Sequence, residues 1–427
     1  MISQEEYKLR RERVAKKLKK NSIALLHSAS HKTRSNDTEF PYRQNSNFYY
    51  LTGFKEDGAA LLLVKGAKKV KTYLFVAKKD PALELWSGKR LGAKRAKELF
   101  DVDDVFEYEK LEEFFKESLL AKTTLYYDFG DKCESLLSLI KLCKKMYAFK
   151  NVAHIIEKER LIKSNAEIAM IQKALSITKE AHHRAMQIVS ELEYEYELQA
   201  EIEYVFKKNG AYSDAYTSIV ASANAANTLH YVSNDAPIKK DALLLIDAGC
   251  EYDYYASDIT RTIPASGKFT DVQKELYTLV LSVEKEIISM IKPGVMRSDL
   301  HKRSEELLCE GMVRLGILDG KVKKLLKKQK HKEFYPHGIG HWMGLDVHDE
   351  APYKKKNGKE IPLKAGMVLT IEPGIYLDAE NKKVPKKYRG IGIRIEDDIL
   401  VTKDGHQNLS SNIVKEIDAI ENMGAKR

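Results

Sequence analysis

Residues 243–262 read LLLIDAGCEYDYYASDITRT. Two apolar runs flank a polar, glycine-containing middle, a pattern typical of strand, turn and strand. Asp247 ends the first run and Asp258 begins the second. A hairpin that turns within 251–254 would place the two aspartates opposite each other, and directly paired residues lie about 4.5–5.5 Å apart at Cβ.

Two carboxylates at that distance repel each other unless a cation lies between them or one of them takes up a proton. The stretch therefore indicates a cation site or a shared proton. A hairpin with two unrelated surface aspartates stays open as the alternative on this stretch alone. A metal site requires further ligands from the rest of the chain.

A second polar segment lies at 337–349 and reads HGIGHWMGLDVHD, with three histidines and three glycines in thirteen residues. Histidines four residues apart can share one face of a helix as a zinc-type pair. Gly338 and Gly340 argue against a helix here and favour a glycine-rich strand or turn. A loop with solvated histidines is the alternative.

Two further carboxylates stand on apolar segments near the C-terminus. The run 367–372, MVLTIE, predicts a strand that ends in Glu372 before Pro-Gly. The run 390–401, GIGIRIEDDILV, begins with strict alternation, so Gly392, Arg394 and Glu396 share one face of a strand. An ordinary buried ion pair between Arg394 and Glu396 is the alternative there.

Together the C-terminal half offers four carboxylates and one or more histidines, each on or next to a predicted strand. Carboxylate oxygens with a single imidazole suit Mn²⁺, Co²⁺, Fe²⁺ or Zn²⁺. Two such ions, about 3.5–4 Å apart, lower the pKa of a bridging water and hold a carbonyl for hydrolysis. A two-metal hydrolytic centre is therefore the leading hypothesis.

Composition is that of a folded globular protein. The chain has 427 residues, of which 43% are hydrophobic and 31% charged, enough for two or three domains. It contains no run of about 18 apolar residues that would predict a transmembrane span, and its N-terminus lacks the apolar segment of a secretory signal. Four cysteines without CxxC spacing indicate reduced thiols in a cytoplasmic protein; they are Cys133, Cys143, Cys250 and Cys309.

The formal net charge of +10 raises the possibility of an anionic partner. Much of the excess is lysine in local runs such as 321–332, KVKKLLKKQKHK. A basic surface can attract nucleic acid, but no aromatic residues interleave with these lysines and no nucleic-acid-binding motif is present. We therefore expect a solvated lysine-rich surface, with neither nucleic acid nor membrane as a partner.

The pattern of predicted strands and helices changes near residue 160. Over residues 1–160, short β-rich runs alternate with helical segments, which predicts an α/β domain with a mixed sheet. Ser164 and Glu167 then form a capping box that opens an amphipathic helix, so a domain boundary is expected just before it. Residues 161–427 combine helices and strands without Rossmann-like repeats and are predicted to be α+β.

At this point the sequence resembles a known family, the pita-bread metallopeptidases, which include methionine aminopeptidase, prolidase and aminopeptidase P. Five residues resemble that family's metal ligands in order and context: Asp247, Asp258, His341, Glu372 and Glu396. The resemblance to bacterial aminopeptidase P extends to YRGIGIRIEDD at 388–398 and, in the N-terminal half, to PYRQNSNFYYLTGF at 41–54 and WSGKRLG at 86–92. It thus covers essentially the whole chain.

The resemblance implies both fold and chemistry. Residues 161–427 would form a pita-bread catalytic domain, and residues 1–160 a creatinase- or prolidase-like domain with oligomer contacts. Two divalent ions, Mn²⁺ before Co²⁺, Zn²⁺ or Fe²⁺, would hold a bridging hydroxide. Asp258 and Glu396 would bridge the ions and Asp247 would complete one site. His341 and Glu372 would complete the other, and Glu372 would also take the proton of the attacking water.

The same resemblance implies roles for residues around the metals. His230 and His348 would polarise the scissile carbonyl and handle the amine and the leaving group. Arg394 would orient the ligand carboxylates, and His337 and Tyr376 would line the proline side. Arg160 and Trp86 match positions that contact substrate, with Trp86 reaching a neighbouring subunit's site in tetrameric members. A homodimer or homotetramer is therefore expected.

The implied activity is removal of the N-terminal residue from peptides with proline at position two. Prolidase, which cuts only Xaa-Pro dipeptides, is the main alternative, and the N-terminal motifs favour aminopeptidase P. A non-catalytic pita-bread binding module is less favoured because all five ligands are present. The lysine-rich segment 353–359, YKKKNGK, departs from the bacterial pattern and leaves the subunit contact and the binding of longer peptides open.

Overall fold

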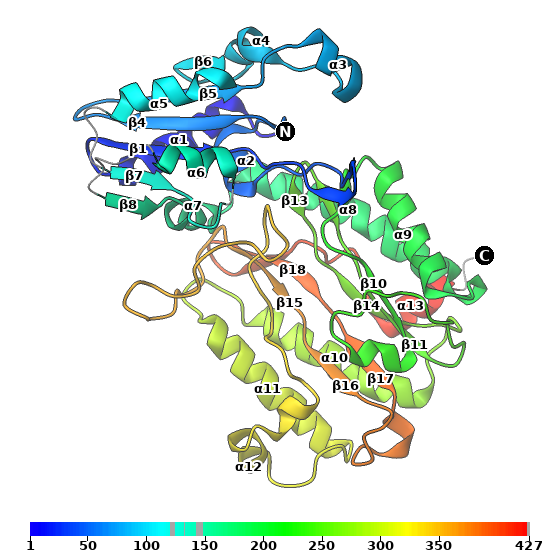
Figure 1. The fold of residues 1–427 in the computed structure, drawn as a ribbon. Helices are drawn as coiled ribbons and strands as arrows, with labels where there is room; N and C mark the ends of the chain where they lie inside the picture. Colours follow the sequence, from blue (N-terminus) through cyan, green and yellow to red (C-terminus); the bar gives the residue numbers. More distant parts are fainter. Residues whose placement is uncertain (120–123, 132, 142–147, 425–427) are drawn as a thin grey trace. The chain divides into compact units, whose positions relative to one another are not determined.

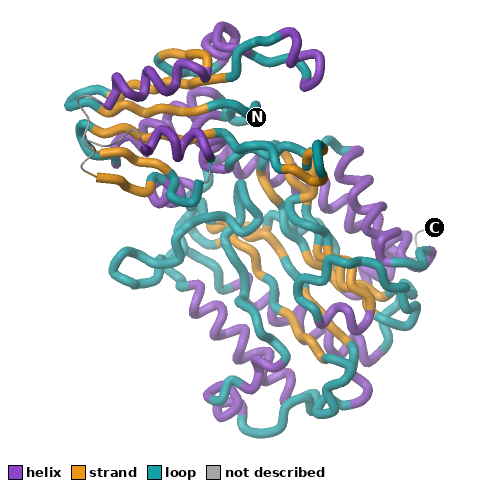
Figure 2. Tube along the Cα trace, in the orientation of Figure 1, coloured by secondary structure: helices purple, strands orange, loops and turns teal. Residues whose placement is uncertain are grey.

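The computed structural model describes residues 1–119, 124–131, 133–141 and 148–424, so Cys143 lies outside the described residues. The chain divides into two compact units, Met1–Arg160 and Leu161–Arg427, whose elements are shown in Figures 1 and 2. Within the described ranges, no helix is long and apolar enough to cross a membrane. Cys250 and Cys309 are buried and carry free thiols.

The first unit is built on a six-stranded sheet with the order β6-β5-β4-β1-β7-β8. The pairs β1–β4 and β4–β5 are antiparallel, whereas β1–β7, β5–β6 and β7–β8 are parallel. The predicted α/β domain with a mixed sheet is therefore confirmed. The strands of this unit are β1 (Ser22–His27), β2 (Thr33–Ser35), β3 (Thr38–Glu39), β4 (Ala60–Lys65), β5 (Val70–Val76), β6 (Asp104–Glu107), β7 (Thr124–Tyr127) and β8 (Ala148–Asn151).

Helices flank this sheet, and local capping starts and ends them. The Asn45 side chain accepts a hydrogen bond from Phe48 N–H at the start of α2, and Gly53 ends that helix with φ of 68°. Ile23, Leu62 and Phe115 are fully buried in the core of this unit. Its helices are α1 (Gln4–Lys17), α2 (Ser46–Thr52), α3 (Pro81–Ser87), α4 (Gly92–Leu99), α5 (Leu111–Leu119), α6 (Glu134–Lys141) and α7 (Ala153–Arg160), with the 3-10 helix η1 (Tyr108–Lys110).

The second unit combines long helices with several small sheets, β10-β11-β14, β13-β12-β9, β15-β18-β19 and β16-β17. Their pairings are antiparallel, which is the predicted α+β organisation. The strands are β9 (Ser213–Asp214), β10 (Ile219–Ser222), β11 (Leu243–Asp247), β12 (Cys250–Tyr252), β13 (Tyr255–Ala256), β14 (Thr260–Pro264), β15 (Val368–Ile371), β16 (Gly374–Leu377), β17 (Ile391–Arg394), β18 (Asp397–Val401) and β19 (His406–Asn408).

The two longest helices, α8 and α10, begin where side chains replace missing backbone partners. Ser164 and Glu167 form the predicted capping box of α8, and Thr270 and Gln273 form another at the start of α10. The helices of this unit are α8 (Asn165–Ile188), α9 (Glu195–Lys208), α10 (Asp271–Ser289), α11 (Arg297–Arg314), α12 (Val322–Lys327) and α13 (Ile417–Gly424). The 3-10 helices are η2 (Val189–Glu191), η3 (Ala223–Asn227), η4 (Lys330–Glu333) and η5 (Lys386–Tyr388).

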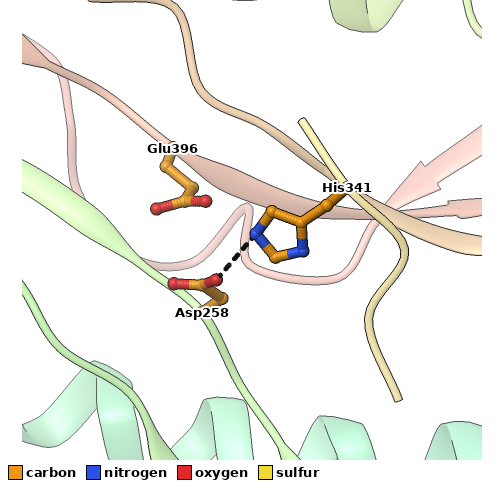
Figure 3. A group of neighbouring side chains, drawn as sticks. All are labelled: Asp258, His341 and Glu396. Atoms are coloured by element: carbon orange, nitrogen blue, oxygen red, sulfur yellow. Dashed lines mark ion pairs between the residues drawn. The ribbon is translucent and has the colours of Figure 1, made fainter. Parts of the chain in front are cut away.

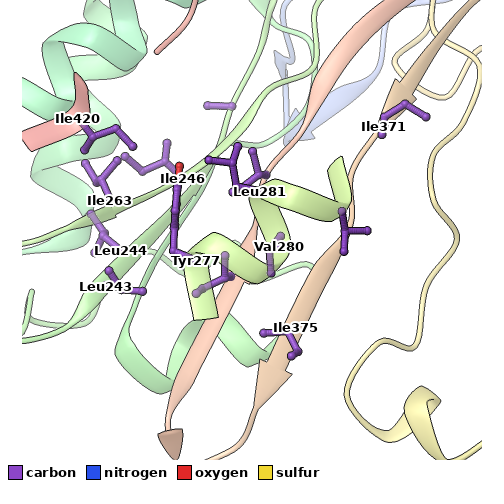
Figure 4. Packing of buried hydrophobic residues seen from close by; sticks show 14 of the residues in the cluster. Leu243, Leu244, Ile246, Ile263, Tyr277, Val280, Leu281, Ile371, Ile375 and Ile420 are labelled. Atoms are coloured by element: carbon purple, nitrogen blue, oxygen red, sulfur yellow. The ribbon is translucent and has the colours of Figure 1, made fainter. Parts of the chain in front are cut away.

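The core of the second unit lies around α10, whose Tyr277 and Val280 are fully buried (Figure 4). The same cluster takes in Leu244 of β11, Ile371 of β15 and Ile375 of β16. Full burial of an aliphatic side chain contributes about 1.5–3 kcal/mol, so this cluster holds the strands firmly. Two of the predicted ligand carboxylates stand at the ends of these strands, Asp247 at β11 and Glu372 after β15.

The hairpin of residues 243–262 forms, but its register differs from the expected one. The turn lies at Asp253–Tyr254, both with positive φ (49° and 70°), and Tyr252 pairs with Tyr255. Asp247 consequently pairs with Thr260 and not with Asp258. Shifting a turn by one residue moves every cross-strand partner by two, which explains the difference.

Candidate metal centre

The five predicted ligands line one cavity of about 440 Å³ in the second unit. Each comes from the end of an element or from a loop. Asp247 ends β11, Asp258 precedes β14, His341 lies in the loop 337–349, Glu372 follows β15 and Glu396 separates β17 from β18. The strand predicted over 390–401 is therefore interrupted, yet Arg394 and Glu396 both reach the cavity.

Three of the five ligands already have the spacing of a metal site. One ligand atom each from Asp258, His341 and Glu396 lie within 4.8 Å of one another. Figure 3 shows the two carboxylates and the imidazole directed toward a common space. His341 Nε2 lies 3.2 Å from Asp258 Oδ2 and 3.8 Å from Glu372 Oε1.

The backbone fixes which nitrogen of His341 faces this space. His341 Nδ1 lies 3.1 Å from the Trp342 carbonyl oxygen, and a carbonyl can only accept, so Nδ1 carries the proton. In the neutral ring Nε2 then offers its lone pair to the carboxylate side, which is the arrangement a metal ligand needs.

His341 lies close to the chain around Thr370. The His341 N–H donates to Thr370 Oγ1 at 3.1 Å. A Cβ at Gly340 would lie 1.9 Å from the Thr370 carbonyl oxygen, so glycine is required for this approach.

The carboxylates carry more negative charge than the protein around them balances. Burial and the nearby Asp258 raise the pKa of Glu396 well above its usual value. Burial also raises the pKa of Glu372 to about 7 and shifts the pKa of Asp247 upward. For His341, burial opposes the charged ring, but the hydrogen bond and charge of Asp258 outweigh it and raise the pKa to about 9. A cation in this space would remove the repulsion.

Arg394 is the guanidinium of the cavity and is held from three sides. Its Nη2 donates to Asp247 Oδ2 at 2.6 Å, its Nε to Thr260 Oγ1 at 3.1 Å, and its Nη1 to the Tyr376 hydroxyl at 3.0 Å. Thr260 Oγ1 in turn donates to Glu396 Oε2 at 2.7 Å. Arg394 therefore orients Asp247 directly and Glu396 through Thr260.

His337 and Tyr376 form a polar pair beside Arg394. His337 Nδ1 donates to the Gly338 carbonyl at 2.8 Å, and its Nε2 lies 2.8 Å from the Tyr376 hydroxyl. Burial and the neighbouring Arg394 lower the pKa of His337 to about 3, so the ring is neutral. Nε2 then accepts from Tyr376, whose own pKa burial raises to about 12.

Two further histidines line the same cavity. His230 follows η3 and is exposed, and His348 is the penultimate residue of the loop 337–349, with its ring centroid 4.1 Å from that of His341. The lining also includes the apolar residues Ile219, Leu229, Val232 and Val347. The cavity thus combines a carboxylate floor, four histidines and a hydrophobic side.

The other two predicted substrate contacts belong to the first unit. Trp86 lies in α3 with 86% of its surface exposed. Arg160 ends α7, is buried, and donates from Nη1 to Asn47 Oδ1 at 2.9 Å. Their predicted roles in substrate binding stay predictions.

Sequence analysis missed two residues of the centre. The Tyr216 hydroxyl lies 2.6 Å from Asp247 Oδ1 and 2.6 Å from Asp258 Oδ1, so it joins the two aspartates that the hairpin does not pair. Asp398 is fully buried and its Oδ2 accepts from Asp258 N–H at 3.1 Å. No local pattern marks Tyr216, whereas three consecutive acids in an apolar run, at 396–398, could have drawn attention to Asp398.

The donor set fits divalent metal ions. Hard carboxylate oxygens with one imidazole are the ligands of Mn²⁺, Fe²⁺, Co²⁺ and Zn²⁺ sites. The buried Asp398 Oδ1 has no hydrogen-bond partner among the described residues. The excess negative charge, the convergent ligand atoms and the fixed histidine tautomer all indicate a site for divalent metal ions.

Comparisons with known proteins agree with this description. Residues 169–403 match the family model of metallopeptidase family M24, and residues 7–126 match that of the aminopeptidase P N-terminal domain. The chain is 40% identical to the Xaa-Pro aminopeptidase of Haemophilus influenzae, covering 99% of this chain and 97% of that protein. It is 34% identical to human Xaa-Pro aminopeptidase 3, covering 98% and 86%.

Solved structures show the same fold. Aminopeptidase P from E. coli with the inhibitor Pro-Leu matches with a TM-score of 0.94 at 36% identity, covering 99% of this chain and 98% of that one. A zinc-substituted E. coli aminopeptidase P in complex with product matches with a TM-score of 0.95 at the same identity and coverage. The second unit therefore has the pita-bread fold.

Proposed function

Because this chain belongs to metallopeptidase family M24, we propose that it is an Xaa-Pro aminopeptidase, which removes the N-terminal residue from peptides with proline at position two. The carrying observation is the cavity in which Asp258, His341 and Glu396 converge. Similarity over the full length to Xaa-Pro aminopeptidases supports the choice within the family.

The proposed centre takes two divalent ions. The residues that would hold them are Asp247, Asp258, His341, Glu372 and Glu396. When bound, such ions ionise a water near neutral pH and polarise the carbonyl to be cleaved. Mn²⁺ is the proposed metal, with Co²⁺, Zn²⁺ and Fe²⁺ as alternatives that the same donor set accepts.

Glu372 is the proposed proton acceptor. Its carboxylate lines the cavity, with 18% of the side chain exposed, and Oε1 lies 3.8 Å from His341 Nε2. Thr370 Oγ1 donates to Glu372 Oε1 at 3.4 Å. The other oxygen, Oε2, lies 3.7 Å from His337 Nδ1. A carboxylate held at one oxygen can take up the proton of the attacking water at the other.

The histidines of the wall would handle the peptide. His230 and His348 would polarise the scissile carbonyl and contact the amine and the leaving group. His337, kept neutral, and Tyr376 would line the side that receives proline, and Arg394 would keep Asp247 oriented. The apolar side chains Leu229 and Val232 leave room for a hydrophobic residue before proline.

The first unit would contribute to substrate binding through Trp86 and Arg160. Trp86 is the most exposed large apolar side chain of α3. An aromatic side chain with that exposure suits a contact with another copy of the chain, and we propose a homodimer or homotetramer. We further propose that the enzyme acts in the cytoplasm on free peptides, with neither nucleic acid nor membrane as a partner.

The test compares cleavage of Ala-Pro, Ala-Pro-Ala and longer Xaa-Pro peptides by the Mn²⁺-loaded protein, with Glu372→Gln as the control. Cleavage of the tripeptide and longer chains, abolished by the substitution, is the expected result. Cleavage of the dipeptide alone would identify a prolidase with the same centre. No cleavage with Mn²⁺, Co²⁺ or Zn²⁺ would overturn the proposal and favour a binding module.

A further inference from the structure

A buried ion pair lies outside the ligand set but holds the loop that carries the predicted ligand His341 and the cavity histidine His348. Lys163 Nζ donates to Asp349 Oδ2 at 3.0 Å, and each side chain is only 1% exposed. Lys163 stands in the short segment before α8, and its backbone N–H donates to the Gly366 carbonyl at 2.8 Å. The pair therefore ties the start of the second unit to residue 349, which is 186 positions later.

Stability alone does not account for such a pair. Removing two charges from water costs free energy that their mutual attraction only partly returns. Well-packed apolar residues of similar volume commonly replace a buried ion pair without loss of stability. The more specific contribution of such a pair is to fix the geometry of the segments that it joins.

Asp349 closes the loop 342–349 with both its backbone and its side chain. Its N–H donates to the Trp342 carbonyl at 2.8 Å, and its Oδ1 accepts from Asp346 N–H at 3.3 Å. A Cβ at Gly344 would lie 2.7 Å from Asp349 Oδ2 and 2.9 Å from Lys163 Cε, so the loop packs directly on the pair.

The same carbonyl connects this loop to the metal centre. Trp342 O accepts from Asp349 N–H at 2.8 Å and from His341 Nδ1–H at 3.1 Å. His348 precedes Asp349 and its ring contacts that of His341, with centroids 4.1 Å apart. The position of Asp349 therefore affects both the ring orientation of His341 and the placement of His348.

We propose that Lys163 and Asp349 are positioning residues, which fix His341 toward the metal side and His348 over the cavity. This inference rests on the proposed function, because it assigns the pair a role in that reaction. Outer partners of metal-binding histidines typically change metal affinity or activity by about 10–100-fold when they are removed.

The experiment replaces the pair by apolar residues in Lys163→Met/Asp349→Leu. The matched control, Arg184→Met/Glu201→Leu, removes a half-exposed pair between α8 and α9 whose atoms lie 2.6 Å apart. Each protein is measured for thermal unfolding, Mn²⁺ affinity by calorimetry, and kcat and KM on Ala-Pro-Ala. We expect the first variant to fold with kcat lowered about 10–100-fold, KM little changed and Mn²⁺ bound about 10-fold more weakly, and the control to match wild type.

Wild-type kcat and Mn²⁺ affinity in a stably folded Lys163→Met/Asp349→Leu would overturn the proposal. If that variant does not fold, Lys163→Met/Asp349→Asn decides, because it removes both charges while keeping the Oδ1 acceptor for the Asp346 N–H. The same kcat loss is then expected, and wild-type kcat contradicts the proposal. If wild type and control both fail to cleave Ala-Pro-Ala, the proposed function is wrong, while Mn²⁺ affinity still tests the positioning pair.

Discussion

Adjacent residues Glu396 and Asp397 belong to two buried charge clusters with opposite balance. The open cluster consists of Asp247, Asp258, Glu372 and Glu396, and it lines the cavity. The closed cluster consists of Arg261, Glu284, Asp397 and Lys415, and its carboxylates meet cations. Arg261 Nη2 donates to Asp397 Oδ1 at 2.7 Å, and Lys415 Nζ donates to Asp397 and, at 2.5 Å, to Glu284 Oε1.

The pKa values of the neighbouring carboxyl groups of Glu396 and Asp397 shift in opposite directions. Burial acts against the charged form of both. At Asp397, the charges of Arg261 and Lys415 overcome burial and lower its pKa, whereas at Glu396 the charge of Asp258 adds to burial and raises the pKa. The difference teaches that burial of charge alone does not mark a functional site. A buried charge that the protein leaves unbalanced, facing a cavity, does.

The largest expected effect comes from replacing Asp397 and Glu396, one at a time, by the amides of the same shape. Asp397→Asn leaves Arg261 without its carboxylate and Lys415 with that of Glu284 alone, and losing one partner of a buried pair costs about 3–5 kcal/mol. Glu396→Gln replaces a carboxyl group whose charged form burial and Asp258 already disfavour in the metal-free protein, so its stability should stay within about 1 kcal/mol of wild type. Urea unfolding of the metal-free proteins measures both.

The two substitutions should also differ in how Mn²⁺ changes the stability of the variant. Glu396→Gln should abolish the stabilisation that saturating Mn²⁺ gives, about 2.7 kcal/mol at a concentration 100-fold above Kd. Equal destabilisation by the two amides without metal would show that the open cluster is balanced by the protein, and the contrast drawn above would fail.

A buried but uncharged histidine provides the reference for the two charged clusters. His182 is fully buried, its Nε2 donates to the Ala248 carbonyl at 3.0 Å, and burial lowers its pKa to about 3. The folded pKa lies below the unfolded value of 6.5, so the folded protein binds fewer protons and stability falls as pH drops below 6.5. Between pH 7 and pH 5 this histidine should cost about 2 kcal/mol.

The measurement is the difference between wild type and His182→Gln in urea unfolding at pH 7, 6 and 5. The glutamine amide can donate to the same carbonyl but does not titrate. Wild type should lose stability faster than the variant on acidification, and parallel curves would contradict the assignment of a neutral buried ring.

The sequence predicted what local chemistry determines. Ser164 with Glu167 starts a helix through contacts three residues apart, so the box is readable without the fold. The hairpin turn was harder to place, because Asp253 and Tyr254 adopt positive φ without the glycine that usually marks such a turn. The register therefore differed from the expected one, and Asp247 met Thr260.

Residues that meet only in three dimensions left no such signal. Tyr216 reaches Asp247 and Asp258 from a loop 31 and 42 positions away. Lys163 reaches Asp349 across most of the second unit. Strand alternation placed Arg394 and Glu396 on one side even though the strand breaks between them, since both line the cavity.

A smaller effect is expected at Tyr216, whose hydroxyl contacts two carboxylates of the open cluster. The Tyr216 hydroxyl lies 2.6 Å from both Asp247 Oδ1 and Asp258 Oδ1 and holds these two carboxylates in position. Tyr216→Phe should leave them less well oriented and weaken Mn²⁺ binding about 10-fold, or about 1.4 kcal/mol. Calorimetric titration with Mn²⁺ measures this. Tyr388→Phe is the matched control, because its hydroxyl donates to Glu275, which is outside the cavity. Equal affinities in the two variants would contradict the role of Tyr216.

The smallest effect is expected where charges remain in water. Arg184 Nε and Glu201 Oε2 lie 2.6 Å apart, but their side chains are 41% and 33% exposed. A double-mutant cycle on this pair should give a coupling of about 0.2–1 kcal/mol, and 1 M salt should reduce it, because screening there acts over about 3 Å. The same cycle on Arg261 and Asp397, both fully buried, should give a larger coupling that salt leaves unchanged. If salt weakened both couplings alike, water would reach the closed cluster, and its balance of charge could no longer explain why it differs from the cavity beside it.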